Sequence, residues 1–206
     1  MNNAGKINHF PRRKLERLDH QFQVLTYEMR DAPERQQTLR NILEWSYRLV
    51  KPDEQQLFRF LSVFVGGCTL QAIESTWELA GYPQEKEHIL EGMVSLLENS
   101  MLFRSMQDTE KPRFCLLKTI RVYGLQSLVL NGEQKRVQWA HAAYSVALAK
   151  RAEPQSPRPL PWMDRLQQEH DNLREALCFL IACKGDEADK ANATSCLEWN
   201  IDSTNN

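Results

Sequence analysis

The chain has 206 residues, with 26 Lys and Arg against 27 Asp and Glu, a formal net charge of −1 and 42% hydrophobic residues. This is long and apolar enough for one or two small domains, and the near-neutral charge argues against a nucleic-acid coat protein or a disordered tail. No apolar run approaches the roughly 20 residues that span a bilayer.

The first ten residues are rich in asparagine and lack the apolar core of an export signal, so we expect a reducing, cytoplasmic setting. The cysteines are scattered, with no C-x-x-C pair and no histidine at zinc spacing, and we interpret them as ordinary thiols. They are Cys68, Cys115, Cys178, Cys183 and Cys196.

A segment from Lys6 to Met29 combines helix-like apolar spacing with a basic flank. Acidic residues within two or three turns dilute its charge, so we interpret it as a solvated helix face rather than a nucleic-acid arm. The basic residues are Arg12, Arg13, Lys14 and Arg17.

Local signals then predict four short helices, over residues 33–50, 52–65, 69–80 and 85–98. Pro52 opens the second, Gly66-Gly67 ends it and Thr69 caps the third. The residues expected to face inward on the first helix are Leu39, Ile42, Leu43, Ser46, Leu49 and Val50, and on the fourth Leu90, Met93, Val94 and Leu97.

Two short β-prone runs, residues 101–105 and 113–117, predict a hairpin that is followed by a helix over 119–130. Helices followed by a hairpin and a closing helix are the layout of a winged-helix module. A helix over 133–151 comes next, then a proline-rich connector at 153–161.

After the connector, the sequence predicts one long amphipathic helix that begins at Trp162. Its apolar stripe is Trp162, Leu166, His170, Leu173, Leu177 and Leu180. The stripe dissolves from Lys184 onward, where we expect fraying or disorder.

Several runs occur together in an order that resembles the post-ATPase region of bacterial STAND regulators of the LuxR-like and SARP-like kind. The resemblance covers about Leu15 to Ile181. The runs are Arg35 to Arg40, Trp45-Ser46-Tyr47, Asp53-Glu54-Gln55, Leu57-Phe58-Arg59, Phe64 to Leu70, Leu96 to Leu102, Arg113-Phe114, Thr119-Ile120-Arg121 and Glu169 to Leu177.

The resemblance implies a mainly α fold: a winged-helix module with one β-hairpin, followed by a TPR-like α-helical segment. In that family a P-loop ATPase and a helical lid precede a winged helix that acts as an internal clamp, and helix pairs receive the signal. We therefore expect a remnant of the lid at residues 1–32, the winged helix at 33–132, the start of the TPR-like sensor at 133–183 and a tail at 184–206.

The chain departs from that family where nucleotide chemistry would reside. It has no G-x-x-x-x-G-K-[ST] loop, so we expect no ATP hydrolysis and assign no cofactor. Related ATPases carry a nucleotide-contacting histidine at the position of Leu117, which cannot donate that hydrogen bond. The LuxR-like branch generally carries Leu at this position too, followed by Glu, so Lys118, and Val122 in place of a usual Glu, are this chain's own departures.

Charge on the expected recognition helix argues against DNA binding. Four acids stand there against Lys86, and the preceding helix carries Glu74 and Glu78 without a basic residue, so phosphates would be repelled. The acids are Glu85, Glu87, Glu91 and Glu98, and the wing adds only Arg104, Lys111 and Arg113.

No histidine has the spacing of a catalytic or metal site, so we assign no catalytic, metal or DNA-binding residue. We expect His141 and His170 to be core histidines and the tryptophans to be core or interface residues. Glu169 with Arg174, and Asp171 with Glu175 nearby, are interpreted as a charge network on the helix surface. The remaining histidines are His9, His20 and His88, and the tryptophans considered are Trp45, Trp77, Trp139 and Trp162.

The sequence thus favours a non-catalytic regulatory and protein-interaction fragment of a STAND regulator. Its partner would be an ATPase or lid module or helical repeats, with self-association through helices after Glu133 and no membrane. Two alternatives are a winged-helix DNA-binding regulator and a truncated product without retained function. Because stacked helix pairs need about three repeats, residues 160–183 should oligomerise or be marginally stable.

Overall fold

The computed structural model describes residues 34–83, 86–105, 112–151 and 160–183. The chain divides into two units, Met1–Asn41 and Ile42–Asn206. All packing described below lies within the second unit. The predicted lid remnant, residues 152–159 and the tail lie outside the described residues. The proline-rich connector predicted at 153–161 ends earlier than expected, because Leu160 and Pro161 are already the first residues of a helix.

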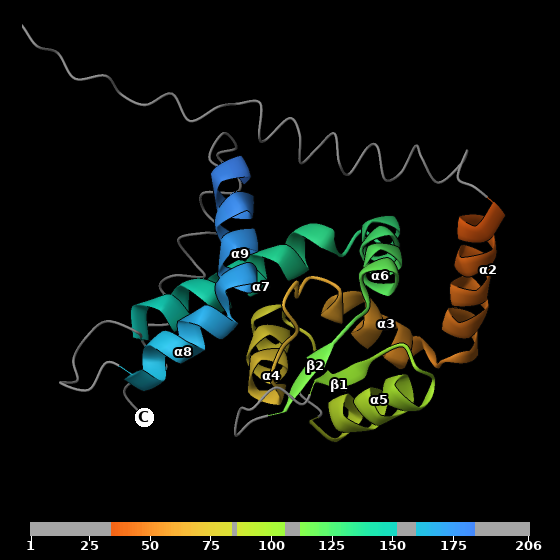
Figure 1. Ribbon diagram of the computed structural model, residues 1–206, viewed down its shortest axis with the longest axis horizontal. Helices are drawn as coiled ribbons and strands as arrows, with labels where there is room; N and C mark the ends of the chain where they lie inside the picture. Colours follow the sequence, from red (N-terminus) through yellow and green to blue (C-terminus); the bar gives the residue numbers. More distant parts are fainter. Residues whose placement is uncertain (1–33, 84–85, 106–111, 152–159, 184–206) are drawn as a thin grey trace, which may run out of the picture. The chain divides into compact units, whose positions relative to one another are not determined.

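The described part is mainly helical and contains one two-stranded antiparallel sheet, which confirms the expected fold class (Figure 1). The elements in chain order are α2 (Glu34–Leu49), α3 (Pro52–Leu61), α4 (Leu70–Leu79), α5 (Lys86–Glu98), β1 (Phe103–Ser105), β2 (Arg113–Cys115), α6 (Lys118–Leu130), α7 (Gln134–Arg151), α8 (Leu160–Gln168) and α9 (His170–Ala182). None of these helices is long and apolar enough to cross a bilayer.

Several predicted helix boundaries are confirmed. Pro52 is the first residue of α3, and the Thr69 hydroxyl accepts a hydrogen bond from the Ala72 amide at 3.2 Å, which caps α4. Gly81 adopts a positive φ angle of 68° just after α4, a conformation that glycine adopts without steric cost. The predicted end of the second helix at Gly66-Gly67 is wrong, because α3 ends at Leu61 with Ser62 as its C-cap, and Gly67, with φ 74°, lies in the turn that follows.

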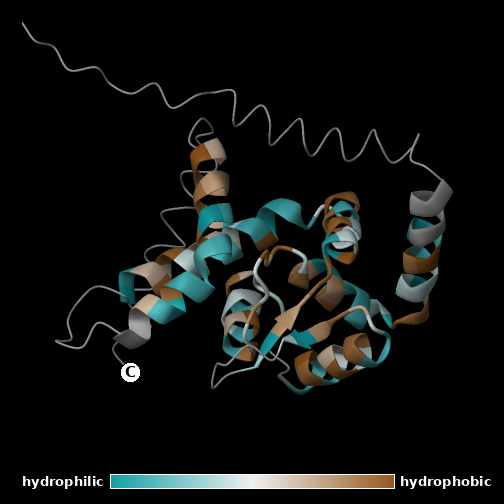
Figure 2. Ribbon diagram, viewed as in Figure 1, coloured by the Kyte–Doolittle hydropathy of each residue, from teal (hydrophilic) through white to brown (hydrophobic). Residues whose placement is uncertain are grey.

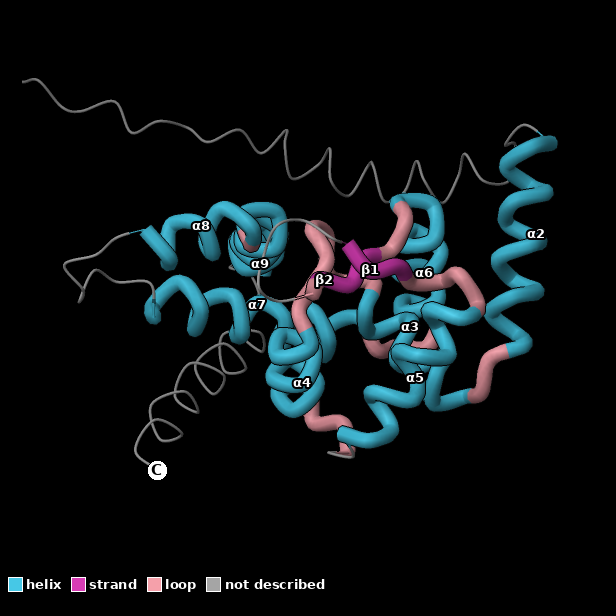
Figure 3. Tube along the Cα trace, turned by 60° about the horizontal axis from the view of Figure 1, so that its bottom comes forward, coloured by secondary structure: helices cyan, strands magenta, loops and turns pink. Residues whose placement is uncertain are grey.

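The two strands pair in the register Phe103 to Cys115, Arg104 to Phe114 and Ser105 to Arg113 (Figure 3). Cys68, just before α4, forms a further antiparallel bridge with Phe114. The segment between α3 and α4 is thereby fixed to the outer edge of β2.

Helices α3 to α6 share one core, Phe114 of β2 packs against it, and α7 contributes Val137 and Ala140 to it. Helix α3 contacts α5 and α6, while α7 lies beside α4 and α9. An aromatic cluster links α3 to α4, with the Phe60 and Trp77 rings 4.9 Å apart and edge-to-face. The fully buried members of the core include Phe58, Phe60, Leu61, Ile73, Leu96, Met101, Leu128 and Val137.

The expected inward face of α2 is partly wrong. Ile42 and Leu49 are 54% and 60% exposed, while Leu43 and Val50 are buried as expected. The buried side of α2 passes through Tyr47, which packs against the Phe58 and Tyr123 rings, and this aromatic contact sets the rotation of the helix. Trp45, expected to be a core or interface residue, is 65% exposed.

The expected inward face of α5 is also partly wrong. Met93 is buried as expected, but Leu90 and Val94 are exposed, and Ile89 and Leu96 are buried instead. A Cβ atom at Gly92 would lie 2.8 Å from Leu57 Cδ2, so the glycine allows close approach of α3 and this side of α5 becomes the buried one.

The predicted single helix after Trp162 is divided at Glu169 into α8 and α9 (Figure 1). Glu169 has φ −93° and ψ 4°, outside the helical range, although its amide still donates to the Arg165 carbonyl at 3.0 Å. The Glu169 side chain is buried in contacts with β2, and these contacts accompany the local departure from helical geometry.

Candidate functional site

A tight turn after α3 provides the backbone of the site. A Cβ atom at Gly67 would lie 2.3 Å from Cys115 Sγ and 2.8 Å from the Phe114 carbonyl, so only glycine fits against β2 here. Cys68 and Phe114 exchange backbone hydrogen bonds of 2.9 and 2.8 Å. The turn is therefore held in one position relative to β2.

Arg113 of β2 reaches this turn. The side chain is 5% exposed, and its guanidinium donates to the Gly67 carbonyl at 2.8 Å and to the Gly66 carbonyl at 3.2 Å. Its other terminal nitrogen donates to Glu169 Oε1 at 2.5 Å. Arg113 thus links the turn to the boundary between α8 and α9.

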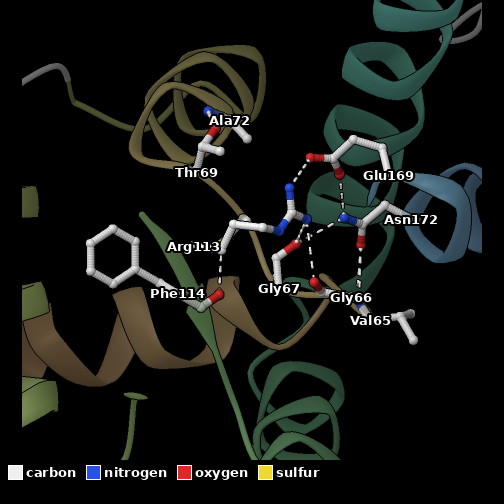
Figure 4. Close-up of polar contacts among 10 residues, drawn as sticks. Val65, Gly66, Gly67, Thr69, Ala72, Arg113, Phe114, Glu169 and Asn172 are labelled. Atoms are coloured by element: carbon white, nitrogen blue, oxygen red, sulfur yellow. Dashed lines mark hydrogen bonds and ion pairs between the residues drawn. The ribbon is translucent and has the colours of Figure 1, made fainter. Parts of the chain in front are cut away.

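Asn172 of α9 completes the arrangement (Figure 4). Its amide nitrogen donates to the Gly67 carbonyl at 2.9 Å and to Glu169 Oε2 at 2.6 Å, and its oxygen accepts from the Val65 amide at 2.9 Å. We call Arg113, Glu169, Asn172 and the Val65–Gly67 backbone the polar junction.

Electrostatics keep Arg113 of the polar junction charged. Burial by itself lowers the pKa of Arg113, but the hydrogen bond and charge of Glu169 outweigh burial, and the pKa is raised overall. Burial raises the pKa of both neighbouring thiols, Cys68 and Cys115, so neither forms a nucleophilic thiolate at neutral pH. The arrangement is suited to holding elements together rather than to covalent chemistry.

A second buried ion pair joins α3 to the start of α7. Arg59 Nε donates to Glu133 Oε2 at 2.7 Å and a terminal nitrogen donates to Tyr47 Oη at 2.7 Å. Burial raises the pKa of Glu133, but the hydrogen bond and charge of Arg59 outweigh it, and the pKa is lowered overall. Glu133 therefore remains a carboxylate.

His141 of α7 is buried, as expected, and its ring lies edge-on to Phe64 with centroids 5.0 Å apart. Burial, and then the charge of Arg121, lowers the pKa of His141 to about 4. Its Nε2 atom has no hydrogen-bond partner among the described residues and borders a cavity of about 10 Å³, so His141 is not the fully satisfied core histidine that we expected.

The structure corrects several further site expectations. His170 is exposed, with 70% of its side chain accessible, because it begins α9 on the side away from the core. Glu169 is not on the surface, and Arg113 is not an exposed cation of the wing. The two side chains form an ion pair with each other, and both are buried. His88 is exposed on α5, and His9 and His20 lie outside the described residues.

One sequence signal could have identified the polar junction. The signal is the helical spacing of Glu169, Asn172 and Ala176, which places them on one side of the helix. All three are buried, so two polar residues lie on the side of α9 that faces the core.

Trp77 and Trp139 are buried, as expected of core residues. In the described residues, no cluster of three or more potential metal ligands occurs.

Comparison with known proteins identifies relatives but no family model and no solved structure. The chain is 35% identical over 164 residues to proteins named "Putative HTH-type transcriptional regulator" from Mycobacterium bovis and from two strains of Mycobacterium tuberculosis. The match covers 79% of this chain and 18% of each relative. The chain resembles part of these regulators. It spans less than one fifth of the relatives' length.

Proposed function

We propose that this chain is a non-catalytic regulatory part of a transcriptional regulator, working through protein contacts. The similarity to proteins named as transcriptional regulators supports the regulatory class. The proposed mechanism is that a partner bound to the helices after the connector acts on the winged-helix-like module, as in the STAND regulators that the sequence resembles.

The polar junction is the observation that carries this proposal. Glu169 and Asn172 stand at the start of α9, yet their bonds end on β2 and on the turn that precedes α4. A displacement of α9 would remove the counter-charge of Arg113 and free the Gly67 carbonyl. Movement in the TPR-like segment would therefore be transmitted to the strands and to α4.

The surface of α9 offers a contact for the partner. Leu177 and Ile181 are 57% and 52% exposed at helical spacing, and the last turns of α9 are coloured hydrophobic in Figure 2. The proposed partner is an ATPase or lid module or helical repeats, and the same face could serve self-association. We expect no ATP hydrolysis by this chain alone, since its sequence has no P-loop.

Mixing the full chain with a cognate STAND ATPase module tests the proposal. We expect association in sedimentation velocity, weakened at least about tenfold by the double substitution L177K and I181K, because apolar anchors dominate such interfaces. The matched control is Leu130→Lys, at a side chain that is 83% exposed on α6. A folded chain that shows no association would contradict the proposal.

DNA binding is a second candidate, favoured by the words "HTH-type" in the relatives' names. The exposed side of α5 nevertheless carries Glu87, Glu91 and Glu98, and Arg113 is buried. Titration with mixed-sequence duplex DNA at low salt distinguishes the two. Salt-sensitive binding would support the DNA-binding function, and a flat titration would exclude it.

A further inference from the structure

Helix α5 exposes a mixed apolar and acidic surface. Leu90 and Val94 are 46% and 54% exposed, and Glu87, Glu91 and Glu98 are exposed beside them. With 3.6 residues per turn, the five positions fall within an arc of about 100°. We call Glu87, Leu90, Glu91, Val94 and Glu98 the α5 face.

The α5 face is held by a rigid support. On the opposite side of the helix, Ile89, Met93 and Leu96 are buried in the core, and the close approach of Leu57 to Gly92 fixes α5 against α3. A helix anchored in this way is already ordered, so it loses little conformational entropy when it binds a partner. The exposed leucine and valine are therefore presented in a fixed geometry.

A groove lies between α5, α3 and the end of α4. It has a volume of about 230 Å³, and the residues that line it include Asp53, Gln56, Trp77 and Ile89. His88 contributes to its rim from the turn of α5 that also carries Glu87 and Glu91. The groove provides space for a long side chain ending in a group attracted to a carboxylate.

We propose that the α5 face, with this groove, is a docking surface for a basic amphipathic helix of a protein partner. Charge complementarity determines the partner: the α5 face has three carboxylates and no basic residue, and Asp53 adds a further carboxyl group in the groove. Leu90 and Val94, one helical turn apart, match the apolar spacing of a partner helix. The inference rests on the proposed action through protein contact and adds its surface and partner chemistry.

A designed peptide tests this surface in the full chain. The probe is a fluorescent 18-residue amphipathic helix with leucines along one side and flanking Lys and Arg, and its control has Glu in place of every Lys and Arg. We expect the basic peptide alone to raise the anisotropy, and its affinity to fall as salt increases, because exposed charges are screened.

Matched variants distinguish binding at the α5 face from nonspecific electrostatic or hydrophobic attraction elsewhere on the surface. Glu91→Lys and Leu90→Ser should each weaken the basic peptide about tenfold. Glu78→Lys, an equal charge change at an exposed site on α4, and Leu130→Ser on α6 should leave binding unchanged. All four sites are exposed, and circular dichroism verifies folding of each variant.

Three results would overturn the inference: no binding of the basic peptide, equal loss in Glu91→Lys and Glu78→Lys, or tighter binding of mixed-sequence DNA than of the peptide. If the ATPase module binds in the mixing experiment but the peptide does not, only the α5 face assignment fails. If the peptide binds as described and the ATPase module does not, the surface stands and the proposed partner is wrong.

Discussion

Arg113 holds its position through partners from two distant parts of the chain. Its guanidinium contacts the Gly66 and Gly67 carbonyls and the Glu169 carboxylate, which lies 56 positions further along the sequence. On an exposed surface, the same side chain would be a candidate for contact with phosphate, since the guanidinium group matches the geometry of both phosphate and carboxylate. In this fold, its burial beside Glu169 determines that its partner is a carboxylate.

Substituting Arg113 with Met should reduce the free energy of unfolding by about 3–5 kcal/mol, because Glu169 would be left buried and uncompensated. Glu169→Met should act similarly by leaving Arg113 unpaired. The double variant should lose about 2 kcal/mol less than the sum of the single losses, as contacting pairs do in double-mutant cycles. Urea unfolding followed by circular dichroism measures all three.

The matched control is the exposed ion pair of α2. The Arg48 and Glu44 side chains are 74% and 40% exposed, so Arg48→Met should change stability by no more than about 0.5 kcal/mol. Strictly additive losses at Arg113 and Glu169 would show that the ion pair contributes no coupling.

At the scale of elements, the starts of helices α3 and α4 were predictable, and the end of α3 and some helix faces were not. Pro52 and Thr69 act through short-range sterics and hydrogen bonds, which are visible in a short stretch of sequence. The rotation of α5 depends on Leu57 of another helix meeting Gly92. When a helix has apolar residues on two sides, packing against neighbouring elements determines which of the two sides is buried.

Gly67→Ala should destabilise the protein by at least about 2 kcal/mol more than Gly81→Ala. Both glycines have positive φ, which costs alanine about 1–2 kcal/mol. Only at Gly67 would the added methyl group also collide with Cys115 and the Phe114 carbonyl, whereas Gly81 has open space around it. Thermal and urea unfolding of the two variants provide the comparison, and equal losses would contradict the packing described for the turn.

For the whole molecule, the sequence predicted the mainly helical class, the order of helices α2 to α7 and the strand pair. It did not predict the polar junction, because the partners of Arg113 and Asn172 are set by tertiary contact. Local rules assigned Glu169 to a surface pair with Arg174, since helix neighbours are the partners that sequence spacing makes visible. Long-range pairing of charges carries no comparable local signature.

Acidification should weaken the folded chain in part through His141. Its pKa is lowered to about 4 in the fold from an ordinary value near 6.5, so between these values the unfolded chain binds the proton more readily. This contribution is fully present above pH 6.5 and is lost as the pH falls toward 4. The free energy of unfolding should drop by about 2 kcal/mol between pH 7 and pH 5 from this group alone.

A His141→Gln variant isolates that effect. Carboxylates such as Glu133, whose pKa is lowered in the fold, also destabilise the protein as they protonate, so the difference between wild type and variant is the relevant quantity. The variant should show a shallower loss of stability from pH 7 to pH 5 in urea titrations. Identical pH profiles would show that His141 titrates normally.

The hydrogen bond from the Val65 amide to Asn172 joins residues 107 positions apart. A contact between residues so far apart closes a long loop, and the chain loses the entropy of loop closure before this hydrogen bond can stabilise the fold. We expect helices α3 and α4 to form earlier, from local contacts, and the polar junction to close after the folding barrier. Contacts made after the barrier mainly change the rate of unfolding, so variants of this junction should unfold faster while folding at a similar rate.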